Sequence, residues 1–271
     1  MMKAVLAETF RRWKMDRHKL LLETALLAGQ IMTESNGESY RVEDTMNRML
    51  TLSKADYAVA VSFSTSLYAT LDDASFTQGS YVGIKRITRR SNNLHKISAV
   101  NKISRELTSG IISIEEAYLK LKLLHRHRDY YQPSLQAVSV IGLCAAFAFL
   151  FGGGGLECLC ATAIGVLLAW SMRMTEKRGL STMVSNVIQA FMVTMLSYLA
   201  MHFFIYRLNV NTVVMATLMP MVPGTAITNS LRDIFREDYL AGGARGMEAF
   251  LEALMIAIGS ALALALLRRL F

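Results

Sequence analysis

The sequence has few charged residues and few cysteines. Charged residues make up 18% of its 271 residues, well below the roughly 25% of an average soluble domain. Hydrophobic residues make up 53%, which excludes an intrinsically disordered chain. The three cysteines, Cys144, Cys158 and Cys160, lie in apolar stretches, where a thiol behaves as a small hydrophobic group. Neither a disulfide-stabilised secreted domain nor a zinc site is supported.

Recognised catalytic and binding motifs are also missing. The sequence contains no G-x-S-x-G, no H-E-x-x-H and no Walker loop, so no residue is assigned a catalytic role. We expect no metal and no cofactor. The basic residues between Lys85 and Arg90 have no nucleic-acid-binding fold around them, so we expect no nucleic-acid partner. Charged residues interrupt the N-terminal 19 residues, which excludes a signal peptide there.

The charges that are present are unevenly distributed. Residues 1–134 hold 20 of the 29 Lys and Arg and 14 of the 21 acidic residues, and residues 135–271 hold the other 9 and 7. Both halves are therefore basic, but the second has about half the charge density of the first. This predicts an integral membrane protein with a small cytoplasmic α+β domain over 1–134, followed by an all-α transmembrane bundle over 135–271.

Five stretches are long and apolar enough to cross a bilayer as helices, which takes about 20 residues. They cover residues 135–151, 156–172, 184–205, 210–231 and 247–267. The basic residues between the second and third stretches, and between the fourth and fifth, are Arg173, Lys177, Arg178, Arg232, Arg236 and Arg245. Because basic connections stay inside, we expect a multi-pass plasma (inner) membrane protein with its N-terminal domain in the cytoplasm. Five spans would then place the C-terminus outside. Arg268 and Arg269, near that end, conflict mildly with this orientation.

Within the first half, hydrophobic periodicity predicts both helices and strands. Helices are expected over residues 18–33, about 38–50, 94–109 and 114–124, and strands over 57–63, 66–71 and 80–87.

The fourth apolar stretch is interrupted by Pro220, Pro223 and Gly224. Prolines remove helical hydrogen bonds, and in lipid the freed backbone groups must be satisfied by protein, water or cargo. A half-helix starting near Pro223 would point its positive dipole end at membrane depth, which suits a carboxylate. Polar side chains follow, and the candidate substrate path comprises Pro220, Pro223, Gly224, Thr225, Thr228, Asn229 and Asp233. The alternative is a structural kink with polar residues that hold helices together.

Three carboxylates lie near the ends of the apolar stretches. Glu157, Glu248 and Glu252 are candidates for proton coupling, which needs a carboxylate that binds a proton when buried. The alternative is that they are ordinary interfacial charges.

The order of several motifs resembles the threonine/serine exporter family over roughly residues 18–267. These motifs are Asn36–Thr45, Asn93–Lys96 with Val100–Glu106, Val222–Gly224, and Asn229 with Arg232–Asp233, Asp238–Gly242 and Arg245. The cytoplasmic residues within them are Gly37, Glu38, Arg41, Glu43, Asp44, Asn101 and Arg105. The resemblance implies a subunit of a secondary transporter that exports threonine, serine or small dicarboxylates such as succinate.

Full-length members of this family carry a second membrane module, whereas this sequence ends after the first. The resemblance therefore implies a separate small membrane subunit in a hetero- or homo-oligomer, besides the lipid bilayer and a small amino-acid or carboxylate substrate. Two other functions stay open at this point. One is a membrane-tethered hydrolase that acts through the cytoplasmic domain, and the other is a non-transporting membrane scaffold.

Overall fold

The computed structural model describes residues 17–76, 79–88, 90–126, 132–203 and 207–270. The chain divides into two compact units. Unit 1 is Met1–Tyr130 with Thr228–Arg245, and unit 2 is Tyr131–Ile227 with Gly246–Phe271. The sequence-based division placed residues 228–245 in the membrane part. They belong to unit 1 because side chains such as Arg245 bond to its N-terminal half.

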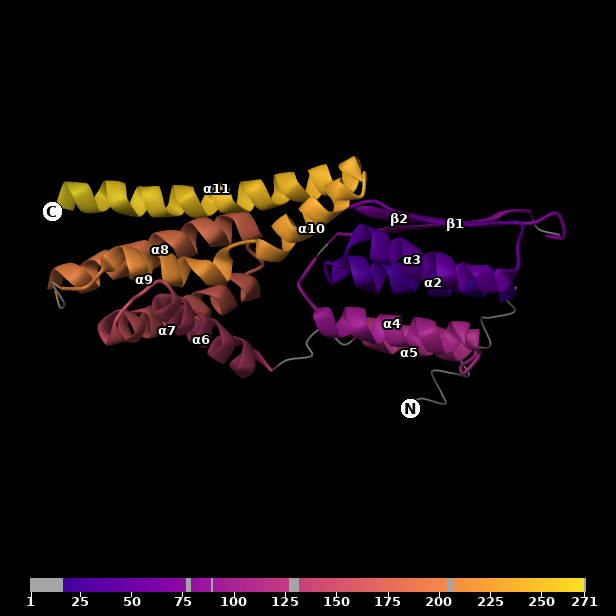
Figure 1. Ribbon diagram of the computed structural model, residues 1–271, viewed down its shortest axis with the longest axis horizontal. Helices are drawn as coiled ribbons and strands as arrows, with labels where there is room; N and C mark the ends of the chain where they lie inside the picture. The colour runs from indigo at the N-terminus through magenta and orange to yellow at the C-terminus, as the bar shows by residue number, and fades with distance from the viewer. Residues whose placement is uncertain (1–16, 77–78, 89, 127–131, 204–206, 271) are drawn as a thin grey trace. The chain divides into compact units, whose positions relative to one another are not determined.

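Over its described residues, the N-terminal half of unit 1 combines four α-helices and one short 3-10 helix with a small sheet (Figure 1). Its elements are α2 (Arg17–Glu34), α3 (Ser39–Leu50), η1 (Thr51–Ser53), β1 (Tyr57–Ser62), β2 (Ser66–Asp72), β3 (Tyr81–Arg86), α4 (Leu94–Thr108) and α5 (Ile114–Arg126). The sheet is antiparallel in the order β1-β2-β3, with Tyr57 opposite Asp72 and Ser66 opposite Arg86. These elements agree closely with those expected from the sequence.

Helices α2 and α3 form the middle layer of unit 1. The sheet packs on one side of them, and α4 and α5 pack on the other (Figure 1). Because α2 is covered on both sides, it is apolar nearly all round, and Leu21, Leu26 and Ile31 are at most 1% exposed. Gly29 permits α3 to approach closely, since a Cβ there would lie 2.2 Å from the Met46 sulfur.

Unit 2 is entirely helical over its described residues. The helices are α6 (Pro133–Leu150), α7 (Gly155–Lys177), α8 (Thr182–Phe203), α9 (Val210–Leu218), η2 (Met219–Met221), and parts of α10 (Gly224–Phe235) and α11 (Tyr239–Leu270). The division between the units falls inside α10 and α11. Within the described ranges, four helices, α6, α7, α8 and α11, are long and apolar enough to cross a membrane, and α9 with α10 makes a fifth candidate if this bent pair is one span. These helices match the five apolar stretches of the sequence.

Small residues bring the helices of unit 2 close together. A Cβ on Gly165 of α7 would lie 3.1 Å from the Cys144 sulfur of α6, and one on Gly259 of α11 would lie 2.4 Å from the Val187 carbonyl oxygen of α8. Such close backbone approach is typical of helices that pack in lipid.

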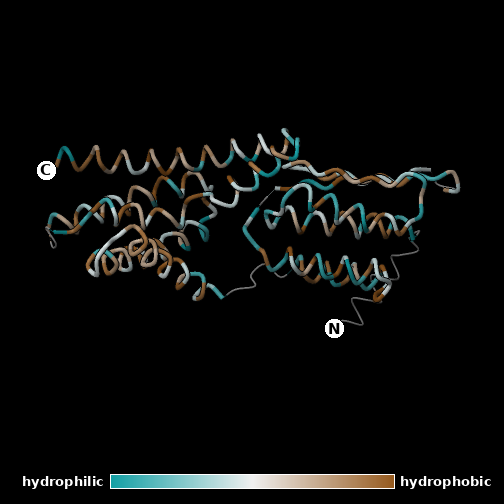
Figure 2. The backbone as a smooth tube through the Cα atoms, in the orientation of Figure 1, coloured by the Kyte–Doolittle hydropathy of each residue, from teal (hydrophilic) through white to brown (hydrophobic). Residues whose placement is uncertain are grey.

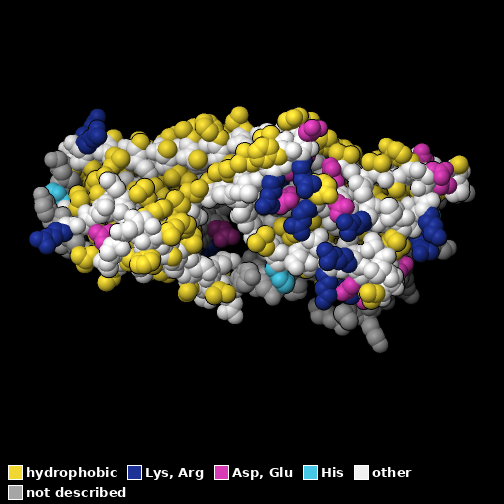
Figure 3. All heavy atoms as spheres, in the orientation of Figure 1, with side chains coloured by type: hydrophobic (Ala, Val, Ile, Leu, Met, Phe, Trp, Pro, Cys, Tyr) yellow, Lys and Arg dark blue, Asp and Glu magenta, His cyan; other side chains and the backbone are white. Residues whose placement is uncertain are grey.

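The surfaces of the two units differ in kind. Figure 2 shows hydrophobic residues along most of α6, α7, α8 and α11. On the face in Figure 3, Lys and Arg side chains gather over unit 1, whereas hydrophobic side chains cover most of unit 2. Large apolar residues of unit 2 such as Leu159, Trp170 and Phe149 are more than half exposed, which is the pattern of a lipid-facing bundle.

Candidate functional site

The helix break lies between η2 and α10. The axes of α9–η2 and α10 differ by 62°. Pro220 lies in η2, and Val222 has extended backbone angles that end the helical run. Helix α10 begins at Gly224, whose N–H bonds back to the Val222 carbonyl oxygen at 2.8 Å. The sequence pattern therefore produces a broken helix, in which Gly224, Thr225 and Thr228 are exposed.

Space is open beside the start of α10. A Cβ on Gly224 would meet no heavy atom within 4 Å. Pro223 is buried, and its carbonyl oxygen accepts the N–H of Ile227 at 3.1 Å in the first turn of α10. The N-terminal turn of α10 can therefore be approached by a small molecule, and its amide groups give it a partial positive charge.

The far end of α10 takes part in a cluster within unit 1. Asn229 donates from Nδ2 to the Asn36 carbonyl oxygen at 2.9 Å. Asp233 lies 3.4 Å from the Arg245 guanidinium, and both side chains are only 2% exposed. The two buried charges are therefore close enough to form an ion pair, but their atoms are farther apart than those of an ordinary hydrogen bond.

Arg245 connects this cluster to the loop between α2 and α3. Its Nη2 donates to the Gly37 carbonyl oxygen at 2.9 Å and to the Ser39 hydroxyl at 3.1 Å. The loop is shaped for this contact, because Asn36 has a left-handed φ of 63° and the Gly37 N–H bonds to the Met32 carbonyl oxygen. Two motifs that are about 200 residues apart therefore meet at one buried guanidinium.

Charged and aromatic side chains surround the buried pair. Arg232 forms an ion pair with Glu38, and the Arg236 guanidinium lies 3.8 Å from the centre of the Tyr40 ring. These outer contacts are more exposed than the Arg245 contacts, so each contributes less to stability.

Two other family-motif residues of the cytoplasmic set, Glu43 and Asp44, lie on α3. Glu43 accepts the Ser62 N–H at 2.7 Å, which ties α3 to the end of β1. Burial raises the pKa of Glu43, against the lowering effect of that hydrogen bond. Asp44 pairs with Arg48 one turn away at 2.8 Å. Both carboxylates therefore have local contacts, Glu43 with the end of β1 and Asp44 within α3.

The three carboxylates proposed for proton coupling differ in their surroundings. Glu157 is buried at the first turn of α7, where its two oxygens accept the N–H groups of Gly154 at 2.8 Å and Asn209 at 3.0 Å. This side chain therefore joins the start of α7 to the start of α9. Glu248 is exposed and Glu252 is half-buried on α11.

A row of buried polar side chains on α8 is the feature that sequence reasoning missed. Its members are Ser185, Asn186, Gln189, Thr194 and Ser197, each at most 8% exposed. Gln189 donates to the Thr175 hydroxyl of α7 at 3.1 Å, and Thr194 donates to the Ser260 hydroxyl of α11 at 3.1 Å. The signal was present in the sequence, because these residues recur three, four and five positions apart within one apolar stretch.

A family comparison connects these features to a class of protein. A family model described as "Putative threonine/serine exporter" matches residues 23–267. The chain belongs to the threonine/serine exporter family. No curated protein and no solved structure matches it. The resemblance inferred from the motifs is thereby confirmed, and the protein is grouped with membrane transporters of amino acids.

In this chain, the expected substrate-path residues fall into two groups. Pro220, Pro223, Gly224 and Thr225 lie at the break in unit 2, whereas Asn229 and Asp233 make their contacts in unit 1. Over the described ranges, no three His, Cys, Asp or Glu side chains are grouped so that they could hold a metal ion.

Proposed function

We propose that this protein is a secondary transporter that exports threonine or serine across the plasma membrane. Unit 2 crosses the bilayer, and unit 1 lies in the cytoplasm. The family match and the five candidate spans support this proposal. The observation that carries it is the broken helix of α9, η2 and α10 in an otherwise apolar bundle, because transporters commonly build substrate sites from discontinuous helices.

The charge distribution supports the orientation. Arg173, Lys177 and Arg178 lie at the C-terminal end of α7, whereas the turn from Gly152 to Gly155 has no charge. Basic residues favour the cytoplasmic side. The C-terminal half of α10 and the start of α11 are proposed to lie on the same side, because Arg232 lies in α10 and Arg236 directly follows it.

The substrate path is proposed to pass the break. A threonine or serine carboxylate would lie at the N-terminal turn of α10, beside Gly224 and Thr225. Pro220 and Pro223 have no N–H to donate, so they prevent a continuous helix from forming across the break. Thr228 continues the path, while Asn229 and Asp233 link it to the family motifs of unit 1.

The buried polar row on α8 favours an amino acid over a dicarboxylate. In the described part of unit 2, every Lys and Arg is exposed at or near a helix end: Arg173, Lys177, Arg178, Arg207, Arg268 and Arg269. A dicarboxylate would therefore be buried without a cation, which is costly. A zwitterion has no net charge, and the hydroxyls and amides of the row can bond to its ammonium and hydroxyl groups.

Coupling to protons is proposed to involve carboxylates of the bundle. Glu252 is the strongest candidate because it is half-buried on α11 and its oxygens accept no hydrogen bond from the described residues. Glu248 lies one turn away, and Glu157 is already occupied by two backbone amides. Under an imposed pH gradient, Glu252→Gln should then abolish the stimulation of efflux while Glu157→Gln should not.

The proposal includes assembly with a second helical bundle. Carriers often hold their cargo at the interface between two bundles, so a separate small membrane subunit or a second copy is the expected partner. Efflux with and without a co-expressed small subunit of the same family distinguishes these arrangements.

Threonine efflux from preloaded cells tests the proposed path. Gly224→Leu should lower efflux at least about tenfold, because a side chain fills the space beside the first turn of α10. Asn229→Ala should also lower it. The matched control is Gly142→Leu on α6, where a Cβ likewise meets no heavy atom within 4 Å. Equal efflux from Gly224→Leu and Gly142→Leu, at equal amounts in the membrane, would contradict the assignment.

A further inference from the structure

Unit 1 contains a second site, separate from the contacts of Arg245. A cavity of about 560 Å³ lies against α3 and α4. Helix α4 turns its apolar side, including Val100 and Leu107, into the core. Its opposite side presents Ser98, Asn101 and Arg105 to the cavity at helical spacing, and α3 contributes Arg41.

The two arginines of this cavity have no acidic partner within the described ranges. Other arginines of unit 1 do, since Arg48 pairs with Asp44 and Arg232 pairs with Glu38. The one carboxylate in the lining belongs to Glu106. It lies 3.1 Å from Lys120 and 4.0 Å from Lys102, so it is already neutralised by lysines.

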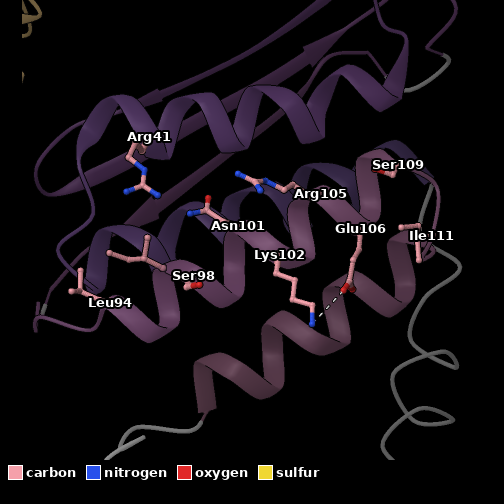
Figure 4. Close-up of a pocket in the computed structure, with 10 residues that line it drawn as sticks. Arg41, Leu94, Ser98, Asn101, Lys102, Arg105, Glu106, Ser109 and Ile111 are labelled. Atoms are coloured by element: carbon pink, nitrogen blue, oxygen red, sulfur yellow. Dashed lines mark ion pairs between the residues drawn. The ribbon is translucent and has the colours of Figure 1, made fainter.

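The orientation of Asn101 adds to the positive character of the site. The Thr45 hydroxyl donates to the Asn101 Oδ1 at 3.4 Å, and Thr45 itself is buried. The amide Nδ2 is therefore left as a donor. Figure 4 shows Arg41, Asn101 and Arg105 directed into the same space between α3 and α4, whereas Lys102 and Glu106 point away toward each other. Two guanidinium groups and an amide thus present only N–H donors to this space.

We propose that this cavity binds a small organic dianion through Arg41, Asn101 and Arg105. Guanidinium groups bind the paired oxygens of a carboxylate or phosphate in a bidentate manner, and two of them match two negative charges. The volume lies within the usual range for small-molecule sites. Leu94 and Ile111, which are 78% and 72% exposed, provide an apolar rim for the carbon skeleton of the ligand.

The site is independent of the proposed transport path, because its residues lie in α3 and α4 of unit 1. The ligand is expected to carry two negative charges on oxygen atoms, and both a phosphomonoester and a dicarboxylate have this chemistry.

Calorimetric titration of the full-length protein in detergent tests the site. The probes are glycerol phosphate and succinate, with glycerol as the uncharged control. Saturable binding of at least one anion is expected, with weaker binding at higher salt. Arg41→Gln and Arg105→Gln should each weaken it about tenfold or more, because each removes a charge-assisted contact. Asn101→Asp should weaken it as well, because it replaces a donor with a negative charge.

Arg48→Gln is the matched control, since it removes one positive charge from α3 about two turns from Arg41. Binding should be unchanged in this variant, and equal melting temperatures across the variants verify that all are folded. The proposal is overturned if neither anion binds saturably, or if Arg41→Gln and Arg48→Gln weaken binding equally. The relative affinity of glycerol phosphate and succinate identifies which anion the site prefers.

Discussion

Replacement of Arg245 by Met should strongly destabilise the contact between the loop after α2 and residues 228–245. The side chains of Arg245 and Asp233 are each only 2% exposed, and Arg245 also bonds to Gly37 and Ser39. Its loss leaves a buried carboxylate without a cation and a carbonyl oxygen without its donor. Breaking a buried ion pair in this way costs about 3–5 kcal/mol.

Hydrogen exchange of the full-length protein in detergent measures this effect locally. A loss of about 3–5 kcal/mol corresponds to roughly 150- to 5,000-fold faster exchange of amides whose exchange requires this contact to open. The affected peptides should cover residues 37–44 and 239–245. The double variant Asp233→Asn with Arg245→Met removes both charges, so its loss should be smaller than the sum of the single losses.

Arg232→Gln is the control within the same cluster. Its ion pair with Glu38 is exposed on the arginine side, where the side chain is 57% accessible. An exposed pair contributes about 0–1 kcal/mol. If Arg245→Met accelerates exchange no more than Arg232→Gln does, the buried pair does not hold these segments together.

Two further predictions concern stability in each unit. Burial raises the pKa of Glu43, so the folded state binds this proton more tightly than the unfolded state does. The free energy of unfolding should therefore fall as the pH rises from the ordinary pKa of 4.5 through the raised pKa. Glu43→Gln keeps an acceptor for the Ser62 N–H, so denaturation measured across pH should no longer show that fall. In unit 2, Gly259→Leu should lower the melting temperature in detergent, because its Cβ would lie 2.4 Å from the Val187 carbonyl oxygen, and overpacking costs about 1–3 kcal/mol. Gly142→Leu, which meets open space, should not lower it, and equal melting temperatures would show that α8 and α11 do not pack at this glycine.

Most of the secondary structure was predictable from local patterns. The apolar stretch predicted at 135–151 corresponds to α6 at Pro133–Leu150, and the alternating residues from Tyr57 form β1. Helix α6 begins where Pro133 fits the first turn. Local patterns were sufficient because the side chains on one face of a helix are three or four positions apart, and those on one face of a strand are two apart.

The contacts of the family motifs could not be read from such patterns. Asp233 is predicted to lie on a substrate path, and the structure adds a contact that no local pattern shows: Asp233 pairs with Arg245, which bonds to Gly37 and Ser39. Likewise, the prediction that Glu157 couples protons did not include its contacts, in which its oxygens accept the N–H groups of Gly154 and Asn209. Partners that are 52 or 208 residues apart are chosen by the packing of whole helices.

The sequence by itself determined the class of this protein. Its apolar stretches, its uneven charge and the order of its motifs indicated a member of the threonine/serine exporter family with a small α+β unit, because hydropathy and motif order are properties of the chain. Tertiary structure decided which polar groups act together. It placed residues 228–245 in unit 1, lined α8 with buried hydroxyls and amides, and brought Arg41 of α3 beside Asn101 and Arg105 of α4. Burial and proximity, which set the strength of every charge and hydrogen bond, exist only after the chain has folded.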